Sequence, residues 1–302
     1  LKHREALGAE YEVGGVPPVE AMHSVDGTIK YLFQVGEKNF VEAVYIPDDD
    51  RATLCVSSQV GCKMNCKFCM TGKQGFTTNL TANQILNQIS SLPERDKLTN
   101  VVLMGMGEPS HNLAAVKEAV EFIGDVAGLA HKQIVVSTVG DERLFDALST
   151  WSVKPALALS LHTTDFEKRQ KLLKNAPALT PEYLLQRTLD YAEQTKYPAQ
   201  IEWTLLAGIN DTFQEVERLA ELVAGRYAMV NFIAVNPTEG SDFKRPSQDH
   251  IEDLITVLRR KGIVATLRDS AAQDIEGGCG QLRARHLSAA RKAPISLEKL
   301  DR

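Results

Sequence analysis

The chain has 302 residues, of which 43% are hydrophobic, and a formal net charge of −5 at pH 7. This length and composition suffice for one α/β barrel or two smaller domains with a sizeable core. The acidic balance does not indicate a nucleic-acid binder, so any RNA contact must come from local patches. Since no apolar run is long enough to cross a bilayer and no signal peptide is visible, we expect a cytoplasmic protein with no membrane contact.

The N-terminal segment has the pattern of a helix that begins upstream. The chain starts at Leu1 rather than at a methionine, and residues 1–11 look like the tail of a helix. We therefore expect residues 1–24 to be the tail of a truncated N-terminal accessory domain with its linker, the remnant of a helical domain.

Residues 25–50 are predicted to form a β-hairpin extension, because two apolar strands, Thr28–Val35 and Phe40–Ile46, flank a turn-rich link. From residue 51 on, strand-like apolar runs alternate with helical patterns. The runs are Leu54–Ser57, Val101–Met106, Ile134–Thr138, Ala156–Leu161, Ile201–Leu206, Val230–Val235 and the shorter Ile263–Leu267. Helix starts are marked by capping boxes at Thr81 and Thr212, by Pro181 after Thr180, and by Ser247.

Six strand–helix repeats predict an α/β fold in which helices cover a parallel sheet. Because a full barrel needs eight units, we expect a partial (β/α)6 barrel over residues 51–270. Residues 271–302 would follow as a cysteine-bearing loop and a basic tail. In such folds the chemistry gathers at the carboxyl ends of the strands.

The loop after the first of these strands carries three cysteines, Cys62, Cys66 and Cys69, in the spacing Cys-x3-Cys-x2-Cys. Thiolates hold iron–sulfur clusters, and a four-iron cluster held by three of them leaves one iron open to a small molecule. This spacing is typical of radical S-adenosylmethionine (SAM) enzymes, in which the open iron binds SAM. The alternative is a structural zinc site with Cys55 as fourth ligand, but the six intervening residues before Cys62 fit paired knuckles poorly.

Glycines and small polar groups follow the other strands. They are Gly105, Gly107 and Glu108, then Ser137, then Ser160 with Leu161 and His162, and finally Asn236. Each alone is more typical of a turn or a cap. Together with the cysteine loop they predict a polar ring above the barrel, where glycines let a ligand approach the backbone and Glu108 offers a carboxylate to an ammonium group.

Two cysteines lie outside the loop. A free cysteine is usually a buried, small apolar residue, and this interpretation is preferred for Cys55 in the first strand. Glycines on both sides of Cys279 favour an exposed, flexible loop whose thiol can react. An odd total of five cysteines, three of them in one loop, argues against a secreted disulfide framework.

These motifs resemble, in their order, the radical SAM RNA methyltransferases that act on adenosine. The likeness runs from about Val25 to about Leu287 and includes the stretch from Cys55 to Cys62, the cysteine loop, Gly-Met-Gly-Glu-Pro, Ser-Thr-Val-Gly, Ser-Leu-His, Asn-Pro and Cys-Gly-Gln-Leu. It is strongest to the branch that makes 2-methyladenosine in 23S rRNA and tRNA. A sister branch methylates C8 and confers antibiotic resistance.

The resemblance implies a role for each motif. A [4Fe–4S] cluster would be held by Cys62, Cys66 and Cys69, and SAM by Gly107, Glu108, Ser137, Ser160, Leu161, His162 and Asn236. Cys279 would be methylated by one SAM, and a radical from a second SAM would activate that methyl group for addition to C2 of adenine. Glu42 would accept the proton from the covalent adduct, and Cys55 would release the product by forming a disulfide with Cys279. The resemblance also implies a flavodoxin-like electron donor and a monomer.

From its spacing alone, Glu42 is a strand glutamate that faces solvent. We expect the N-terminal RNA-binding domain of the family to be almost entirely absent here. Basic residues that could contact phosphates are scattered along the chain. The candidates are Lys168, Arg169, Lys171 and Lys174; Arg259, Arg260 and Lys261; and Arg283, Arg285, His286, Arg291 and Lys292. The first two groups are more typical of solvated helix faces, and the third is favoured because it follows Cys279. Such contacts would make RNA binding salt-dependent.

Three alternatives remain open. The same apparatus serves a C8-specific methyltransferase of 23S rRNA. The same cysteines could serve a non-catalytic zinc- or RNA-binding protein. A radical SAM enzyme acting on a small molecule is disfavoured, because it would leave Cys279 and its glycines without a task.

Overall fold

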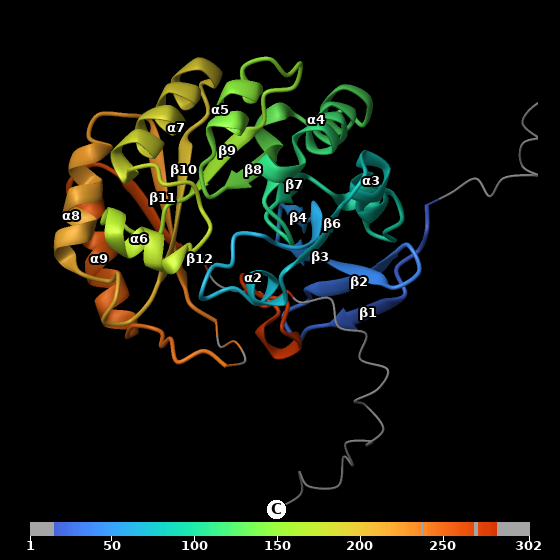
Figure 1. Cartoon of the computed structure of the whole chain (residues 1–302), viewed down its shortest axis with the longest axis horizontal. Coiled ribbons are helices and arrows are strands. Elements are labelled where there is room, and N and C mark those ends of the chain that lie inside the picture. Colours follow the sequence, from blue (N-terminus) through green and yellow to red (C-terminus); the bar gives the residue numbers. More distant parts are fainter. Residues whose placement is uncertain (1–14, 237, 239, 269–270, 283–302) are drawn as a thin grey trace, which may run out of the picture.

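One ten-stranded sheet organises the computed structural model, which describes residues 15–236, 238, 240–268 and 271–282 (Figure 1). Its strand order is β1-β2-β3-β4-β7-β8-β9-β10-β11-β12. Strands β1 to β4 pair antiparallel, and every pair from β4 to β12 is parallel. The sheet is therefore a parallel half-barrel with an antiparallel extension at one edge, which confirms the predicted fold class.

The antiparallel extension contains the predicted hairpin and one strand more. Its strands are β1 (Glu20–His23), β2 (Ile29–Val35) and β3 (Asn39–Pro47). Strand β1 was not predicted, because its four residues include only one buried side chain, Met22, and so show no apolar alternation.

All seven predicted strands of the parallel part are present, with ends that differ by a few residues. They are β4 (Ala52–Cys55), β7 (Asn100–Leu103), β8 (Ile134–Thr138), β9 (Ala156–Ser160), β10 (Ala199–Leu205), β11 (Ala228–Ala234) and β12 (Val264–Arg268). A separate two-stranded sheet of β5 (Gln59–Gly61) and β6 (Phe76–Asn79) flanks the cysteine loop and was not predicted.

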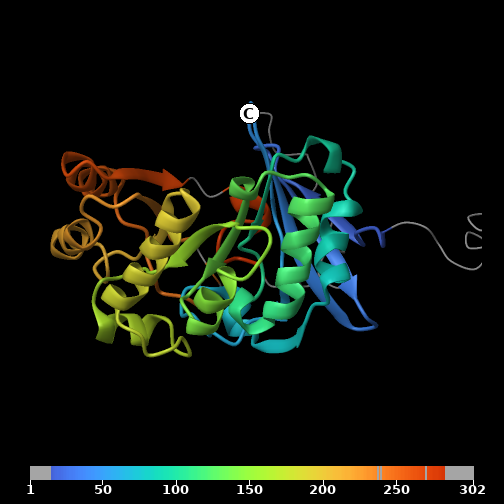
Figure 2. The ribbon, with the colours of Figure 1, turned by 90° about the horizontal axis from the view of Figure 1, so that it is seen from above.

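Helices cover the outer face of the curved sheet (Figures 1 and 2). They are α3 (Ala82–Ser90), α4 (Leu113–Glu121), α5 (Glu142–Leu148), α6 (Phe166–Leu172), α7 (Pro181–Thr195), α8 (Phe213–Leu222) and α9 (Gln248–Arg260). Shorter pieces are α2 (Met70–Gln74), η1 (Arg95–Lys97), η2 (Pro109–Asn112), η3 (Phe122–Val126), η4 (His131–Gln133) and η5 (Gln273–Ile275). Within the described part of the chain, no helix is long and apolar enough to span a membrane.

The predicted helix starts are confirmed. The side chains of Thr81, Thr180, Thr212 and Ser247 each accept a backbone N–H of the following turn. Thr81 and Gln84 form the full capping box. At Thr212 only half of the box forms, because the carboxylate of Glu215 instead accepts hydrogen bonds from Thr163 and Lys168.

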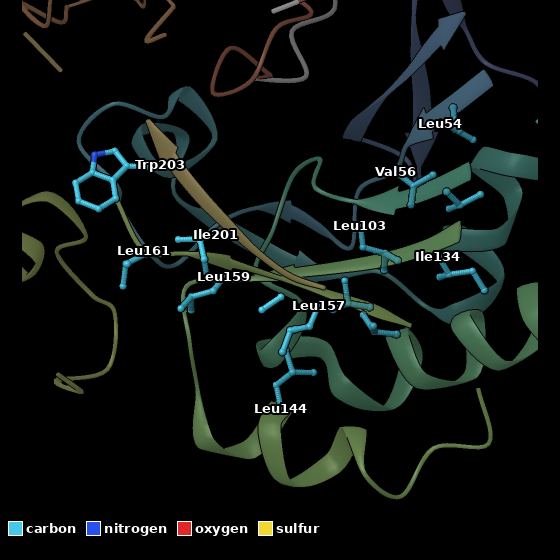
Figure 3. Packing of buried hydrophobic residues seen from close by; sticks show 14 of the residues in the cluster. Leu54, Val56, Leu103, Ile134, Leu144, Leu157, Leu159, Leu161, Ile201 and Trp203 are labelled. Atoms are coloured by element: carbon cyan, nitrogen blue, oxygen red, sulfur yellow. The ribbon is translucent and has the colours of Figure 1, made fainter. Parts of the chain in front are cut away.

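The main core fills the space between the sheet and these helices. Buried apolar side chains on neighbouring strands face outward toward the helices (Figure 3). They include Leu54, Leu103, Ile134, Leu157 and Ile201. Burying each such side chain contributes about 1.5–3 kcal/mol. This packing fixes the strands, and so the positions of the loops at their carboxyl ends. The expected division into residues 1–24, 25–50, 51–270 and 271–302 stays a prediction.

Candidate active site

A cavity opens at the carboxyl ends of the parallel strands and is lined by most of the predicted site residues. Its walls include Cys62, Cys66 and Cys69 from the cysteine loop, Gly107 and Glu108 after β7, Ser137 of β8, Ser160 and His162 at the end of β9, Asn236 after β11, and Cys279. Cys279 follows Cys69 by 210 residues of sequence, so only the tertiary fold brings the two together. Of the predicted residues, Glu42, Cys55 and Leu161 do not line this cavity in the described part of the chain.

The cysteine loop (residues 62–69) is fixed by backbone hydrogen bonds rather than by regular structure. Cys62 N donates to Gly75 O at 3.0 Å, and Lys67 N donates to Leu172 O at 3.0 Å. Gly61 precedes the loop with φ +75°, and an added Cβ would lie 1.7 Å from the carbonyl oxygen of Gly75. Only glycine fits there, because any side chain would collide with backbone.

Glu108 lies buried at the end of β7, with 3% of its surface exposed. Its Oε1 accepts hydrogen bonds from Thr138 Oγ1 at 2.6 Å and Ser110 N at 3.2 Å, and its Oε2 accepts one from Val139 N at 3.0 Å. Burial raises the pKa of Glu108, while these hydrogen bonds oppose the increase. A carboxylate has about four acceptor positions, so Oε2 keeps one for a ligand such as an ammonium group.

Cys279 belongs to a segment, residues 271–282, that packs against α2 (Figure 1). Met70 N donates to Gly280 O at 2.7 Å, and Asn236 Nδ2 donates to Cys279 O at 3.1 Å. The Cys279 side chain is accessible within the cavity, which confirms the expected exposure. Desolvation by the cavity walls raises the pKa of this thiol, and the positive charge of Arg268 opposes that increase.

The model of the radical SAM superfamily matches residues 56–223, more than half of the chain. The chain belongs to the radical SAM superfamily.

Similar proteins identify the family of this chain within the superfamily. A relative named "Probable RNA methyltransferase" from Methylibium petroleiphilum is 46% identical over 293 residues, covering 96% of this chain and 82% of the relative. A protein of the same name from Thiobacillus denitrificans is also 46% identical, covering 96% and 80%. The crystal structure of a radical SAM methyltransferase from Sphaerobacter thermophilus matches with a TM-score of 0.88 at 35% identity, covering 94% of this chain and 86% of that chain. Within the superfamily, the chain belongs to this methyltransferase family.

Radical SAM enzymes use a [4Fe–4S] cluster and SAM, and the donor set of the cavity fits a cluster. Three thiols line one wall, yet no three His, Cys, Asp or Glu side chains among the described residues converge on a single metal ion. A cluster needs no such convergence, because each thiolate binds a different iron. Cys62, Cys66 and Cys69 would hold it here.

The environment of these thiols indicates what a bound metal must supply. Burial, assisted by the negative charge of Glu108, raises the pKa of Cys62 to about 12, and burial raises the pKa of Cys66 well above its usual value. Because the thiolate is the metal-binding form, the positive charge of bound iron must offset this cost.

His162 contributes a neutral ring to the lining of the cavity. Its Nδ1 accepts a hydrogen bond from Thr204 N at 3.0 Å, and its ring meets the ring of Phe68 edge-on at 4.9 Å. Burial, with the nearby charge of Arg169, lowers the pKa of His162 to about 3. The neighbouring Leu161 points into the core instead (Figure 3), so only its backbone could reach a cofactor.

Cys55 and Glu42 do not line the cavity, but Cys55 packs against the same apolar cluster as Met104, which does. Burial raises the pKa of Cys55 to about 12, and the negative charge of a Cys279 thiolate adds to the increase. The position of Glu42 in the hairpin suggested that its side chain faces solvent, but only 2% of the residue is exposed. Its Oε1 lies 3.3 Å from Lys30 Nζ. Lys30 Nζ also donates to Glu276 O at 3.2 Å, which ties this pair to the Cys279 segment.

The predicted phosphate contacts are partly wrong. Arg169 is fully buried, and its Nη2 donates to the carbonyl oxygens of Val139 and Ser160, so it cannot meet RNA. Lys168 pairs with Glu215, while Lys171 and Lys174 are exposed. Arg259 donates to Ala265 O, and Arg260 and Lys261 are exposed. The favoured group, Arg283, Arg285, His286, Arg291 and Lys292, lies outside the described residues.

Glu202, Arg268 and Met104 are among the cavity residues that sequence reasoning missed. Glu202 lies in β10 between Ile201 and Trp203, and a charged residue inside an apolar strand is the signal that could have found it. Arg268 is the last residue of β12, and a cation at the end of a strand does not by itself indicate a functional residue.

Proposed function

We propose that this radical SAM enzyme methylates C2 of an adenosine in 23S rRNA and tRNA through an S-methylcysteine at Cys279. The observation that carries the proposal is the meeting of Cys279 and the three cluster cysteines in one cavity. The names of the relatives, probable RNA methyltransferases, support RNA as the substrate. A cytoplasmic, monomeric enzyme served by a flavodoxin-like donor is part of the same proposal.

A ring carbon of adenine is a poor nucleophile, so direct methyl transfer from SAM to C2 is not expected. When bound, the cluster and SAM supply a one-electron cleavage that yields a radical able to remove a hydrogen atom. The Cys279 sulfur can receive a methyl group by displacement and then present it inside the cavity. After loss of one hydrogen atom, the carbon on Cys279 can bond to C2.

Release of the product requires a base and a second thiol. Glu42 is proposed to accept the proton from the adduct, and the bond from Lys30 to Glu276 links its surroundings to the Cys279 segment. Cys55 is proposed to attack Cys279, so that an S–S bond forms as the bond between the Cys279 sulfur and carbon breaks. The carbon would take up a proton to complete the methyl group, and the unpaired electron of the adduct would return to the bound cluster. Cys55 packs against the same apolar cluster as Met104, which lines the cavity together with Cys279, and this placement supports the step. Two electrons from the donor must then reduce the disulfide.

The adenine must also leave its stack to reach this recessed cavity. SAM is proposed to bind in this cavity so that Cys279 faces it. The residues proposed to hold it are Gly107, Glu108, Ser137, Ser160 and Asn236, with the backbone of Leu161 and the neutral ring of His162.

The test is mass spectrometry of the reconstituted protein, incubated with and without SAM. We expect the mass of one methyl group on the peptide that carries Cys279, and no such mass in Cys279→Ala. An unmodified Cys279 in protein with a full complement of iron would overturn the relay. Nucleoside analysis of treated 23S rRNA and tRNA then separates 2-methyladenosine from 8-methyladenosine, and the latter would overturn the assignment to C2.

A further inference from the structure

Polar side chains form a continuous row across the inner face of four parallel strands. The strand register places Ser160 of β9 beside Glu202 of β10, Glu202 beside Asn231 of β11, and Asn231 beside Thr266 of β12. Thr266 Oγ1 lies 3.0 Å from Asn231 Oδ1, and Asn231 Nδ2 donates to Glu202 Oε1 at 2.8 Å. The row therefore fixes the orientation of the Glu202 carboxylate.

The other oxygen of the Glu202 carboxylate, Oε2, takes no part in this row. Glu202 is 3% exposed and lines the cavity, yet its Oε2 has no hydrogen-bond partner among the described residues. Arg268 Nη1 is 3.6 Å away, beyond hydrogen-bond length, and lies 3.5 Å from Met104 Sδ. A buried acceptor without a donor costs free energy, so a ligand that supplies the donor would be favoured.

The surroundings of Glu202 indicate which donor this is. Glu108 N donates to Gln59 Oε1 in β5, the strand that leads into the cysteine loop, so Glu108 lies at the cysteine-loop end of the cavity and suits the amino group of SAM. Glu202 is on β10, three strands from β7 in the sheet order, and lies beside Ser160, whose Oγ is 3.4 Å from Ser137 Oγ. The apolar side chains of Ile233 and Val235 line the same cavity and suit a base. In SAM, the part that lies between the amino-acid end and the base is the ribose, which carries a pair of hydroxyl groups.

We propose that Glu202 binds the ribose hydroxyls of SAM through Oε2. The proposal rests on the use of SAM by the radical SAM superfamily, and it is independent of the RNA substrate and of the methylated carbon. Asn231 and Thr266 are positioning residues, which hold the carboxylate without touching the cofactor.

The test is a binding cycle on the cluster-reconstituted protein, with S-adenosylhomocysteine as an unreactive probe and its 2′,3′-dideoxyribose analogue as the partner. The wild-type protein should bind the dideoxy analogue about 10- to 100-fold more weakly, as expected for loss of hydrogen bonds to a charged group. Glu202→Gln should bind S-adenosylhomocysteine about 10-fold more weakly and should discriminate between the two probes by less than about 3-fold.

Thr188→Val is the control, since it removes a buried hydroxyl hydrogen bond, from Thr188 Oγ1 to Leu184 O within α7, outside the cavity, and should leave discrimination unchanged. Iron content checks that each variant keeps its cluster. If the wild-type protein binds both probes equally, the proposal is overturned without any variant. It is also overturned if Glu202→Gln weakens both probes equally, because the residue is then structural.

Discussion

The cysteine loop (residues 62–69) and the Cys279 segment (residues 271–282) meet in one cavity but are held in different ways. The loop is held by its backbone: Lys67 N donates to Leu172 O, and Asn175 N donates to Met64 O. The Cys279 segment is held largely by side chains from distant elements. Asn236, Thr71 and Lys30 each donate to one of its carbonyl oxygens.

This difference matches what each cysteine must do. Backbone bonds preserve the loop geometry whatever side chains vary, which suits ligands of a permanent cluster. Side-chain bonds can be exchanged one at a time, which suits a thiol proposed to meet first SAM, then adenine, then Cys55. The two attachments predict different responses to substitution.

The largest effect is expected in the cysteine loop. Cys66→Ala removes one of only three thiolates, so iron content should fall to background and methylation should be lost. Cys55→Ala, outside the loop, should keep the full iron content. Iron and sulfide analysis after anaerobic reconstitution distinguishes the two, and iron retained in Cys66→Ala would contradict the assignment.

Next in size is the buried pair that braces the Cys279 segment. Lys30→Met removes the ammonium group from beside a buried carboxylate, Glu42, and should lower the free energy of unfolding by about 3–5 kcal/mol. Arg51→Met, which breaks the exposed pair with Asp48, should change it by less than about 1 kcal/mol. Urea unfolding measures both, and equal effects would show that burial of the first pair is unimportant.

The pH dependence of the cluster-free protein should report His162. The pKa of His162 is about 3 in the folded protein and about 6.5 when unfolded. The unfolded chain therefore binds a proton that the folded protein excludes, and stability should fall as pH decreases below about 6.5, by about 1.4 kcal/mol per pH unit. Unfolding between pH 7 and pH 4 tests this, and His162→Gln should show a shallower slope.

The smallest effect comes from a matched pair of amide hydrogen bonds, one to each region. Asn236→Ala removes a donor to Cys279 O, and Asn175→Ala removes a donor to Lys63 O in the cysteine loop. Each should cost about 1 kcal/mol of stability. Only Asn236→Ala should change the rate at which iodoacetamide alkylates Cys279, by a few-fold. Equal alkylation rates would mean that the two regions are held alike.

The sequence alone predicted the parallel strands, the helix caps and the cluster ligands, because each depends on local spacing. Apolar runs mark strands that are buried on both faces, and Thr81 or Ser247 caps a helix with a hydrogen bond two or three residues away. The cysteine spacing is likewise contained in eight consecutive residues, from Cys62 to Cys69. The strand β1 escaped prediction, since its pairing with β2 supplies what its own pattern lacks.

Only the tertiary structure decided how distant residues combine. Glu42, expected at the surface, is buried because Lys30 on the neighbouring strand supplies its counter-charge. Arg169, expected on a solvated helix face, is buried because the ends of β8 and β9 offer it carbonyl oxygens. The orientation of the Glu202 carboxylate, with its unpartnered Oε2, depends on strand register, which no single segment encodes. Local spacing thus determined which residues could hold a cluster, and long-range packing decided which side chains face it.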